Sequence, residues 1–165
     1  KTIEPKTLLT TLTEEKTIDS ASFITKWKGH FDKKDATYND EKAYCEENNL
    51  NVAFNRLEND VASYEYTLNE VSKNDCADFI FVIYEPTDST GHDYGFTINN
   101  PRYKEAFQTA DQYGADTISA IQERETYETE DWLIIVTSDH GGFKREHGYE
   151  SIQERMTFIV SNKEF

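Results

Sequence analysis

Residues 79–95 read FIFVIYEPTDSTGHDYG, a continuous apolar run that leads directly into a polar loop. The run, residues 79–84, is too short for a helix and rich in residues that favour strands. Runs of this kind are typical of strands that are buried on both faces of a parallel sheet. The run also indicates where to look for a site, because ligands of such sheets gather beyond the carboxyl ends of the strands.

The loop after this run carries an aspartate and a histidine in a spacing that suits one binding site. Asp88 and His92 lie four residues apart, so in a helical turn their side chains project to the same side. Gly91 and Gly95 allow the backbone to approach other groups closely, as a compact metal loop requires. Taken alone, the loop is equally consistent with a solvated polar turn.

A second loop of the same kind follows residues 132–136, which read WLIIV and predict another buried strand. Asp139 and His140 are adjacent there, so on a regular strand they would point in opposite directions. They can serve one centre only where the strand breaks into a turn, and the glycines at 141 and 142 supply that break. His147 lies further along the same loop.

Two such loops together favour a metal site over two unrelated polar turns. Three of the four histidines lie in these loops, and the other, His30, is better explained by packing. Aspartate oxygens and histidine nitrogens are ligands that suit zinc and its neighbours among the metals. The sequence therefore predicts a metal centre with these ligands: Asp88, His92, Asp139, His140 and His147.

The remaining pattern predicts the fold class. Helices are expected at 5–15, 40–47, 57–71 and 103–121, and strands at 22–27, 79–84, 132–136 and 156–160. The polar stretch 28–55 is expected to be a surface excursion around the small helix. Strands separated by such helices imply βαβ crossovers. We expect a single α/β domain over residues 1–165, with a doubly wound, mostly parallel sheet and helices on both faces.

The chain is strongly acidic, with 32 Asp and Glu against 17 Lys and Arg and a formal net charge of −15. Such a surface repels nucleic-acid backbones and anionic membranes, which disfavours a nucleic-acid-binding module. It would also repel a phosphate ester, unless a bound divalent cation reversed the local charge. Lys144 and Arg145 form a rare basic pair inside the second loop. We expect them to contact substrate phosphate, with a solvated loop as the alternative.

Two further features bear on the compartment of the protein. No apolar run approaches the roughly 20 residues that a membrane-spanning helix needs. Cys45 and Cys76 lack the spacing of a zinc-thiolate or redox motif. One disulfide in an exported protein and two separate thiols both remain open.

The two loops resemble the metal motifs of the alkaline phosphatase superfamily, most closely those of its type I phosphodiesterase/nucleotide pyrophosphatase branch. That branch has a pattern like P-D-x-x-G-H-x-x-G after one strand and S-D-H-G after a later one. Residues 86–95 read PTDSTGHDYG, with Thr87 as an extra residue, and residues 138–141 match the second pattern fully. The motifs cover the chain from residue 78 onwards, while residues 1–77 share only the coarse pattern.

The resemblance implies a hydrolase that acts on a small phosphate ester by in-line displacement between two divalent ions. Zinc is expected, with Mn²⁺ or Ca²⁺ as alternatives. By the same resemblance, the first ion is held by Asp88, His92 and His147. The second ion is held by Asp139 and His140.

The same resemblance bears on completeness and location. A threonine or serine nucleophile and one further aspartate of the family normally precede the region where this chain starts. We therefore expect a fragment that requires the N-terminal part of its own domain as a partner and is inactive alone. Members of the family are often exported or membrane-anchored, so an extracytoplasmic location is expected.

Two other interpretations remain open. The first is a sulfatase or phosphomonoesterase of the same superfamily; a sulfatase would carry a Cys/Ser-x-Pro-x-Arg motif upstream of the first residue. The second is a non-catalytic binding or interaction domain with a vestigial metal site. An acidic surface with 10 tyrosines would suit protein or glycan contact.

Overall fold

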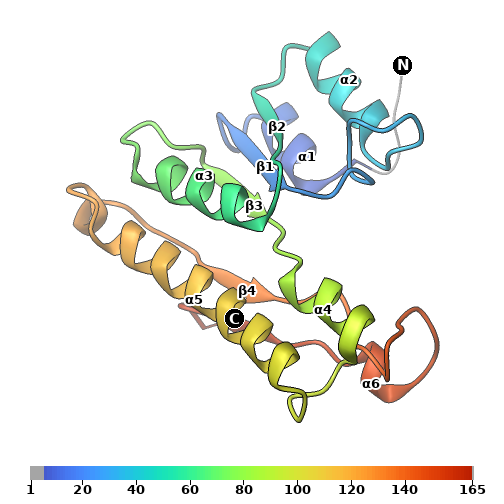
Figure 1. The fold of residues 1–165 in the computed structure, drawn as a ribbon. Helices are drawn as coiled ribbons and strands as arrows, with labels where there is room; N and C mark the ends of the chain where they lie inside the picture. The colour runs from blue at the N-terminus through green and yellow to red at the C-terminus, as the bar shows by residue number, and fades with distance from the viewer. Residues whose placement is uncertain (1–5, 165) are drawn as a thin grey trace. The chain divides into compact units, whose positions relative to one another are not determined.

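The computed structural model describes residues 6–164, which fold into two compact units, Lys1–Tyr84 and Glu85–Phe165. We call them the first and the second unit and describe each by itself (Figure 1). Pro5, which was expected to begin the first helix, lies outside the described residues. The single domain expected over residues 1–165 stays a prediction.

The first unit contains a three-stranded parallel sheet with the order β2-β1-β3. This sheet and its helices confirm the predicted α/β class with parallel strands. The helices match the expected positions closely. The elements are α1 (Leu8–Glu14), β1 (Ala21–Thr25), α2 (Asn39–Glu47), β2 (Val52–Arg56), α3 (Asp60–Ser72) and β3 (Phe79–Val82).

The core of the first unit is built around Phe23 on the central strand. Its ring lies 5.4 Å from the ring of Phe31 and 5.2 Å from that of Phe81, measured between centroids. His30 packs into the same aromatic cluster, 5.3 Å from Phe23, and its Nδ1 lies 3.0 Å from the Thr25 hydroxyl. His30 therefore has the packing position that the sequence indicated.

Two expectations for the first unit were wrong. Strand β3 is not buried on both faces, because Phe81 is 40% exposed, whereas every residue of β1 is buried. The apolar run therefore marks a neighbour of the central strand and not the central strand itself. The polar stretch 28–55 also contains β2, whose mixed sequence VAFNR resembles a loop more than a strand.

The two cysteines are unpaired and lie in different environments. Cys45 is buried and Cys76 is partly buried. Burial raises the pKa of the Cys45 thiol, which therefore stays protonated and unreactive.

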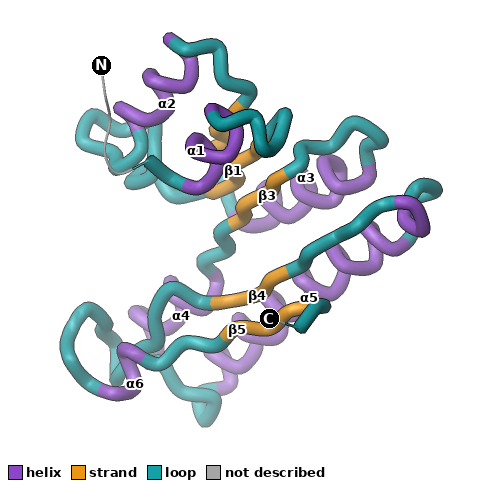
Figure 2. Tube along the Cα trace, turned by 180° about the vertical axis from the view of Figure 1, so that it is seen from behind, coloured by secondary structure: helices purple, strands orange, loops and turns teal. Residues whose placement is uncertain are grey.

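The second unit consists of two helices and a small ribbon of two strands. Helices α4 (Pro86–Tyr94) and α5 (Pro101–Gln122) both have a proline in the first turn, where its missing N–H has no cost. Figures 1 and 2 show α5 running alongside β4 and β5. The remaining elements are η1 (Tyr127–Thr129), β4 (Ile135–Thr137), α6 (Ile152–Arg155) and β5 (Ile159–Ser161).

The ribbon differs from the two buried parallel strands expected at 132–136 and 156–160. β4 and β5 pair with each other in antiparallel fashion, with Val136 opposite Val160. These two valines are 40% and 60% exposed. Parallel pairing needs a crossover, usually through a helix, and the connection here contains only the four-residue α6. Apolar composition alone did not show which direction each strand would take.

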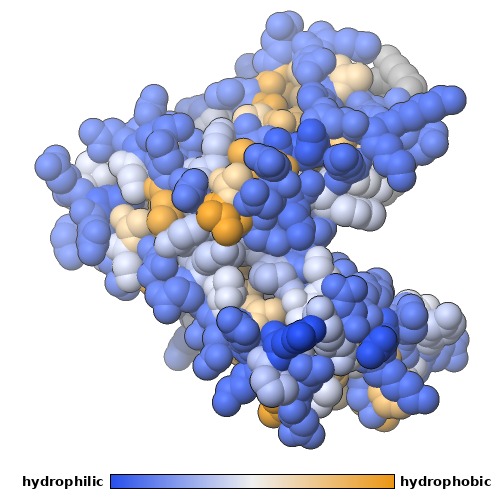
Figure 3. Space-filling model, in the orientation of Figure 1, coloured by the Kyte–Doolittle hydropathy of each residue, from blue (hydrophilic) through white to orange (hydrophobic). Residues whose placement is uncertain are grey.

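The surface agrees with the acidic composition. In the face shown in Figure 3, hydrophilic residues dominate and hydrophobic ones form scattered patches. Among the described residues, no helix is both long and apolar enough to cross a membrane.

A buried arginine joins the end of α5 to the segment that leads into β4. The Arg124 side chain is 3% exposed and donates to both carboxylate oxygens of Glu130, at 2.7 and 2.6 Å. The Trp132 indole N–H and the Thr126 hydroxyl also donate to this carboxylate, each at 2.7 Å. These bonds, that to Arg124 first, lower the pKa of Glu130 from 4.5 to about 2.

We predict that Glu130→Gln lowers the melting temperature of the protein at neutral pH. The Glu130 pKa is depressed on folding, so its contribution is complete above pH 4.5 and lost as pH falls toward about 2. The difference in melting temperature between parent and variant should therefore shrink across that window. Circular dichroism measures it, with Glu128→Gln on the neighbouring exposed carboxylate as control. A difference that is constant with pH would contradict the assignment.

Candidate metal centre

Helix α4 and the loop after β4 bring the predicted ligands of the first ion together. Asp88 and His92 lie one turn apart on α4, with Asp88 Oδ1 3.5 Å from His92 Nε2. The loop returns His147 to the same carboxylate, with Nε2 3.3 Å from Asp88 Oδ1. The helical turn expected for the first motif is thus observed, and all three side chains face one point.

His140 belongs to the same cluster. Its ring stacks on that of His147 with centroids 3.8 Å apart and an angle of 23° between the planes. Asp88, His140 and His147 offer ligand atoms that all lie within 4.8 Å of one another, so they could hold a metal ion. By resemblance His140 pairs with Asp139 on a second ion, whereas the structure groups it with Asp88 and His147.

Asp139 occupies a more open position than the other predicted ligands. Its side chain is 89% exposed, and its Oδ2 lies 3.7 Å from His140 Nε2. Its other oxygen accepts the backbone N–H of His140 at 3.0 Å. The carboxylate is thus beside the cluster and turned largely toward solvent.

Backbone carbonyls fix the tautomers of two histidines. The Nδ1–H of His92 donates to the Arg145 carbonyl at 2.8 Å, and that of His140 donates to the Gly141 carbonyl at 2.9 Å. A carbonyl can only accept, so each Nδ1 carries the proton and each Nε2 keeps its lone pair. Metal-binding histidines are held in this way by outer partners. The atoms left free to bind a cation are those that face Asp88.

Asp88 Oδ1 gives the clearest indication that the residues fit a metal ion. This atom is sealed from solvent and, among residues 6–164, receives no hydrogen bond. A buried carboxylate oxygen without a donor is costly, because its desolvation is not offset. Two imidazole nitrogens without protons face the same oxygen, and a divalent cation among them would satisfy all three atoms.

Gly141 allows the second loop to pass against α6. A Cβ at this position would lie 2.0 Å from the carbonyl oxygen of Gln153 and 2.8 Å from that of Met156. The Gly141 N–H donates to the carbonyl of Glu154 at 2.9 Å. The double glycine therefore breaks the strand, as the sequence predicted, and also permits this close backbone approach.

Lys144 and Arg145 contact the centre through their backbone. They lie in a two-residue turn closed by reciprocal backbone hydrogen bonds between Phe143 and Glu146, with Lys144 at φ 57°. Their carbonyls accept hydrogen bonds from the Phe96 N–H and from His92. Both residues are exposed. Sequence reasoning missed the carbonyl contacts, because residue type does not show where a carbonyl points.

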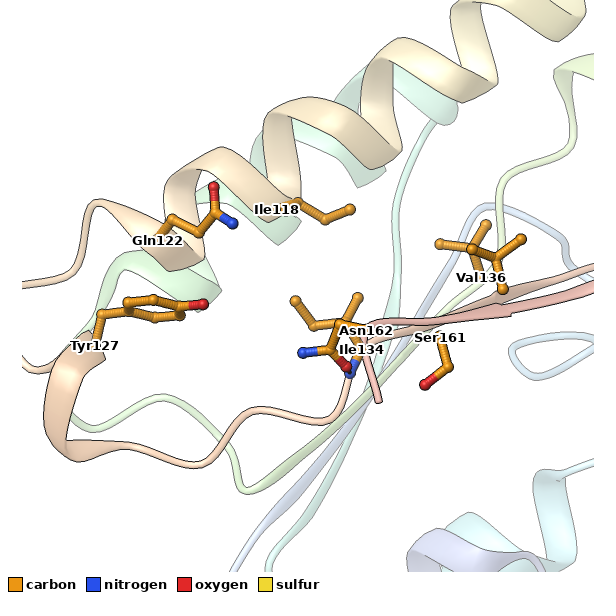
Figure 4. A pocket seen from close by; sticks show the side chains of 8 residues that line it. Ile118, Gln122, Tyr127, Ile134, Val136, Ser161 and Asn162 are labelled. Atoms are coloured by element: carbon orange, nitrogen blue, oxygen red, sulfur yellow. Dashed lines mark hydrogen bonds between the residues drawn. The ribbon is translucent and has the colours of Figure 1, made fainter. Parts of the chain in front are cut away.

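A cavity of about 210 Å³ lies elsewhere in the second unit, between α5 and the ribbon (Figure 4). It contains none of the predicted ligands. Ile118 and Tyr127 lie on one side and Val136 on the other, so the lining is mostly apolar. The amide of Asn162 already bonds the backbone of Trp132 and Ile134. The cavity therefore lacks the groups that the chemistry of the metal centre requires.

We predict that Asp88→Asn lowers the zinc affinity of the chain by at least about 10-fold, since even outer-shell changes cost that much. The amide removes the negative charge at the point where the imidazoles converge. Isothermal titration calorimetry with zinc measures the effect. Asp93→Asn, on the exposed part of the same helix, is the matched control. Equal zinc affinity in parent and Asp88→Asn would remove Asp88 from the site.

Comparison with known proteins agrees with this geometry. The family model described as type I phosphodiesterase / nucleotide pyrophosphatase matches residues 5–153. The match includes both motifs and also the first unit, where the motifs gave no information. No curated protein and no solved structure matches the chain.

Proposed function

The chain belongs to the type I phosphodiesterase/nucleotide pyrophosphatase family, and on that premise we propose that it forms the metal-holding part of a zinc-dependent hydrolase of phosphodiester or pyrophosphate bonds. The observation that carries the proposal is the buried Asp88 Oδ1, which faces the Nε2 atoms of His92 and His147. A phosphate ester is the substrate class that this family shares.

The ligand types favour zinc over the harder divalent ions. Three imidazoles and two carboxylates gather within one cluster, and imidazole nitrogen suits zinc, whereas Mg²⁺ and Ca²⁺ prefer oxygen ligands. Asp88, His92 and His147 would hold the first ion. Asp139 and His140 would hold the second, more weakly, because two protein ligands are too few for tight binding.

Bound zinc would supply positive charge to the phosphate oxygens as negative charge develops on them. The residues of this chain prepare for that role. Asp88 and the three imidazoles face one point, and the carbonyls of Arg145 and Gly141 keep two imidazoles in the metal-binding tautomer. The local charge would thereby be reversed on a protein whose net charge is −15, so that an anionic ester can approach.

The proposal assigns the nucleophile to neither Thr90 nor Ser138, the hydroxyl residues of the two motifs. The family pattern gives these positions no such role. The test of activity therefore uses two proteins, the 165-residue chain and the polypeptide translated from the whole reading frame.

We predict that the whole polypeptide hydrolyses bis(p-nitrophenyl) phosphate faster than p-nitrophenyl phosphate or p-nitrophenyl sulfate. Chelation should abolish the activity and zinc should restore it, since the proposed centre has no other source of positive charge. The 165-residue chain should bind zinc without turnover. Release of p-nitrophenol measures each rate. A preference for the sulfate would favour a sulfatase, and zinc binding without turnover of any ester by the whole polypeptide would favour a non-catalytic domain.

We predict that replacing Lys144 and Arg145 together by alanine raises KM for the diester about 3- to 10-fold and leaves kcat unchanged, as expected for exposed charges that contact substrate. Alanine keeps the carbonyls that support Phe96 and His92. Zinc affinity should therefore stay at the parent value. Lys104→Ala on the exposed face of α5 is the control. An unchanged KM would reject substrate contact by the pair.

A further inference from the structure

Phe96 lies between the two motifs that carry the metal ligands. It follows Gly95, the residue that ends α4 with φ 100°. A Cβ added to Gly91 on α4 would lie 2.3 Å from the Phe96 ring, and one added to Gly142 in the second loop would lie 2.2 Å from it. The ring therefore fills the space above one glycine of each motif. Neither glycine can gain a side chain unless Phe96 moves.

The same ring contacts two of the predicted ligands. It meets the imidazole of His92 edge to face at 5.5 Å and 81°, and that of His147 at 6.2 Å and 86°, measured between centroids. These imidazoles belong to different motifs and lie 4.8 Å apart. On its other side, Phe96 meets the ring of Tyr103 on α5 at 5.8 Å. Aromatic pairs of this geometry fix the orientation of the rings.

The backbone of Phe96 completes the connection. Its N–H donates to the carbonyl of Lys144 at 2.7 Å. The next carbonyl in that turn, that of Arg145, accepts from His92. One residue thus joins the first motif to the second through its ring and through its main chain.

We propose that Phe96 is a positioning residue that sets the separation of the two motifs, so that His92 and His147 both reach Asp88. The proposal rests on the metal site of the proposed function. It concerns this chain's own packing and adds no ligand. Loss of the ring would allow the second loop to shift relative to α4. The three ligand atoms would then no longer converge, even if the unit stayed folded.

The experiment is a double-mutant cycle on Phe96 and Gly142, measured by zinc affinity and by the visible spectrum of the cobalt-substituted protein. Phe96→Ala should weaken zinc binding by about 10- to 100-fold, the range for residues that orient metal ligands. Phe96→Leu should lose less. Gly142→Ala should weaken binding in the parent, because its Cβ meets the ring, and should have little further effect in the Phe96→Ala background.

A purely structural phenylalanine would give a different set of results. It would lower the melting temperature of the metal-free protein while affinity and cobalt spectrum stayed at parent values. Phe107→Ala, which removes a half-exposed phenylalanine from α5, controls for that effect. Should Phe96→Ala fail to fold, the cobalt spectra of Phe96→Leu and Gly142→Ala decide.

Parental zinc affinity and cobalt spectrum in Phe96→Ala would overturn the proposal, as would additive effects of the two substitutions. Those outcomes leave the proposed function intact, because the parent still binds zinc. A parent that takes up no zinc would instead overturn the proposed function, and the positioning role with it.

Discussion

A carboxylate oxygen hidden from water is the constraint around which the second unit is organised. Asp88 Oδ1 has no hydrogen-bond donor among the described residues, and a negative atom in such a place requires a positive partner. The turn of α4 brings His92 to it, and the returning loop brings His147. The surrounding carbonyls, glycines and aromatic ring make sense as supports for that convergence, which would be costly without a cation.

Much of the centre could be predicted from residue types, because metal ligands require particular side chains in either loop. Its supports could not be predicted in this way. The carbonyls of Lys144 and Arg145 act on Phe96 and His92, and any residue in their places would present the same group. The position of His140 beside His147 was also hidden, since adjacency to Asp139 suggested a shared second ion.

The fold shows a similar division. Long amphipathic helices such as α5 were predictable from their periodicity. Strand β2 was not, because VAFNR lies in a polar stretch and gains its strand geometry from pairing with β1. The antiparallel direction of β4 and β5 was equally hidden, because pairing direction depends on the connection and not on the apolar residues of each strand.

The turn at Lys144 separates two duties that most site residues combine. Its main chain serves the centre, while both of its side chains project from an exposed position. Evolution can therefore change the side chains at these two positions without disturbing the geometry beneath them. Diversity among descendants of such a protein would be inexpensive there, and a laboratory library that aims to change its ester preference would best begin with this pair.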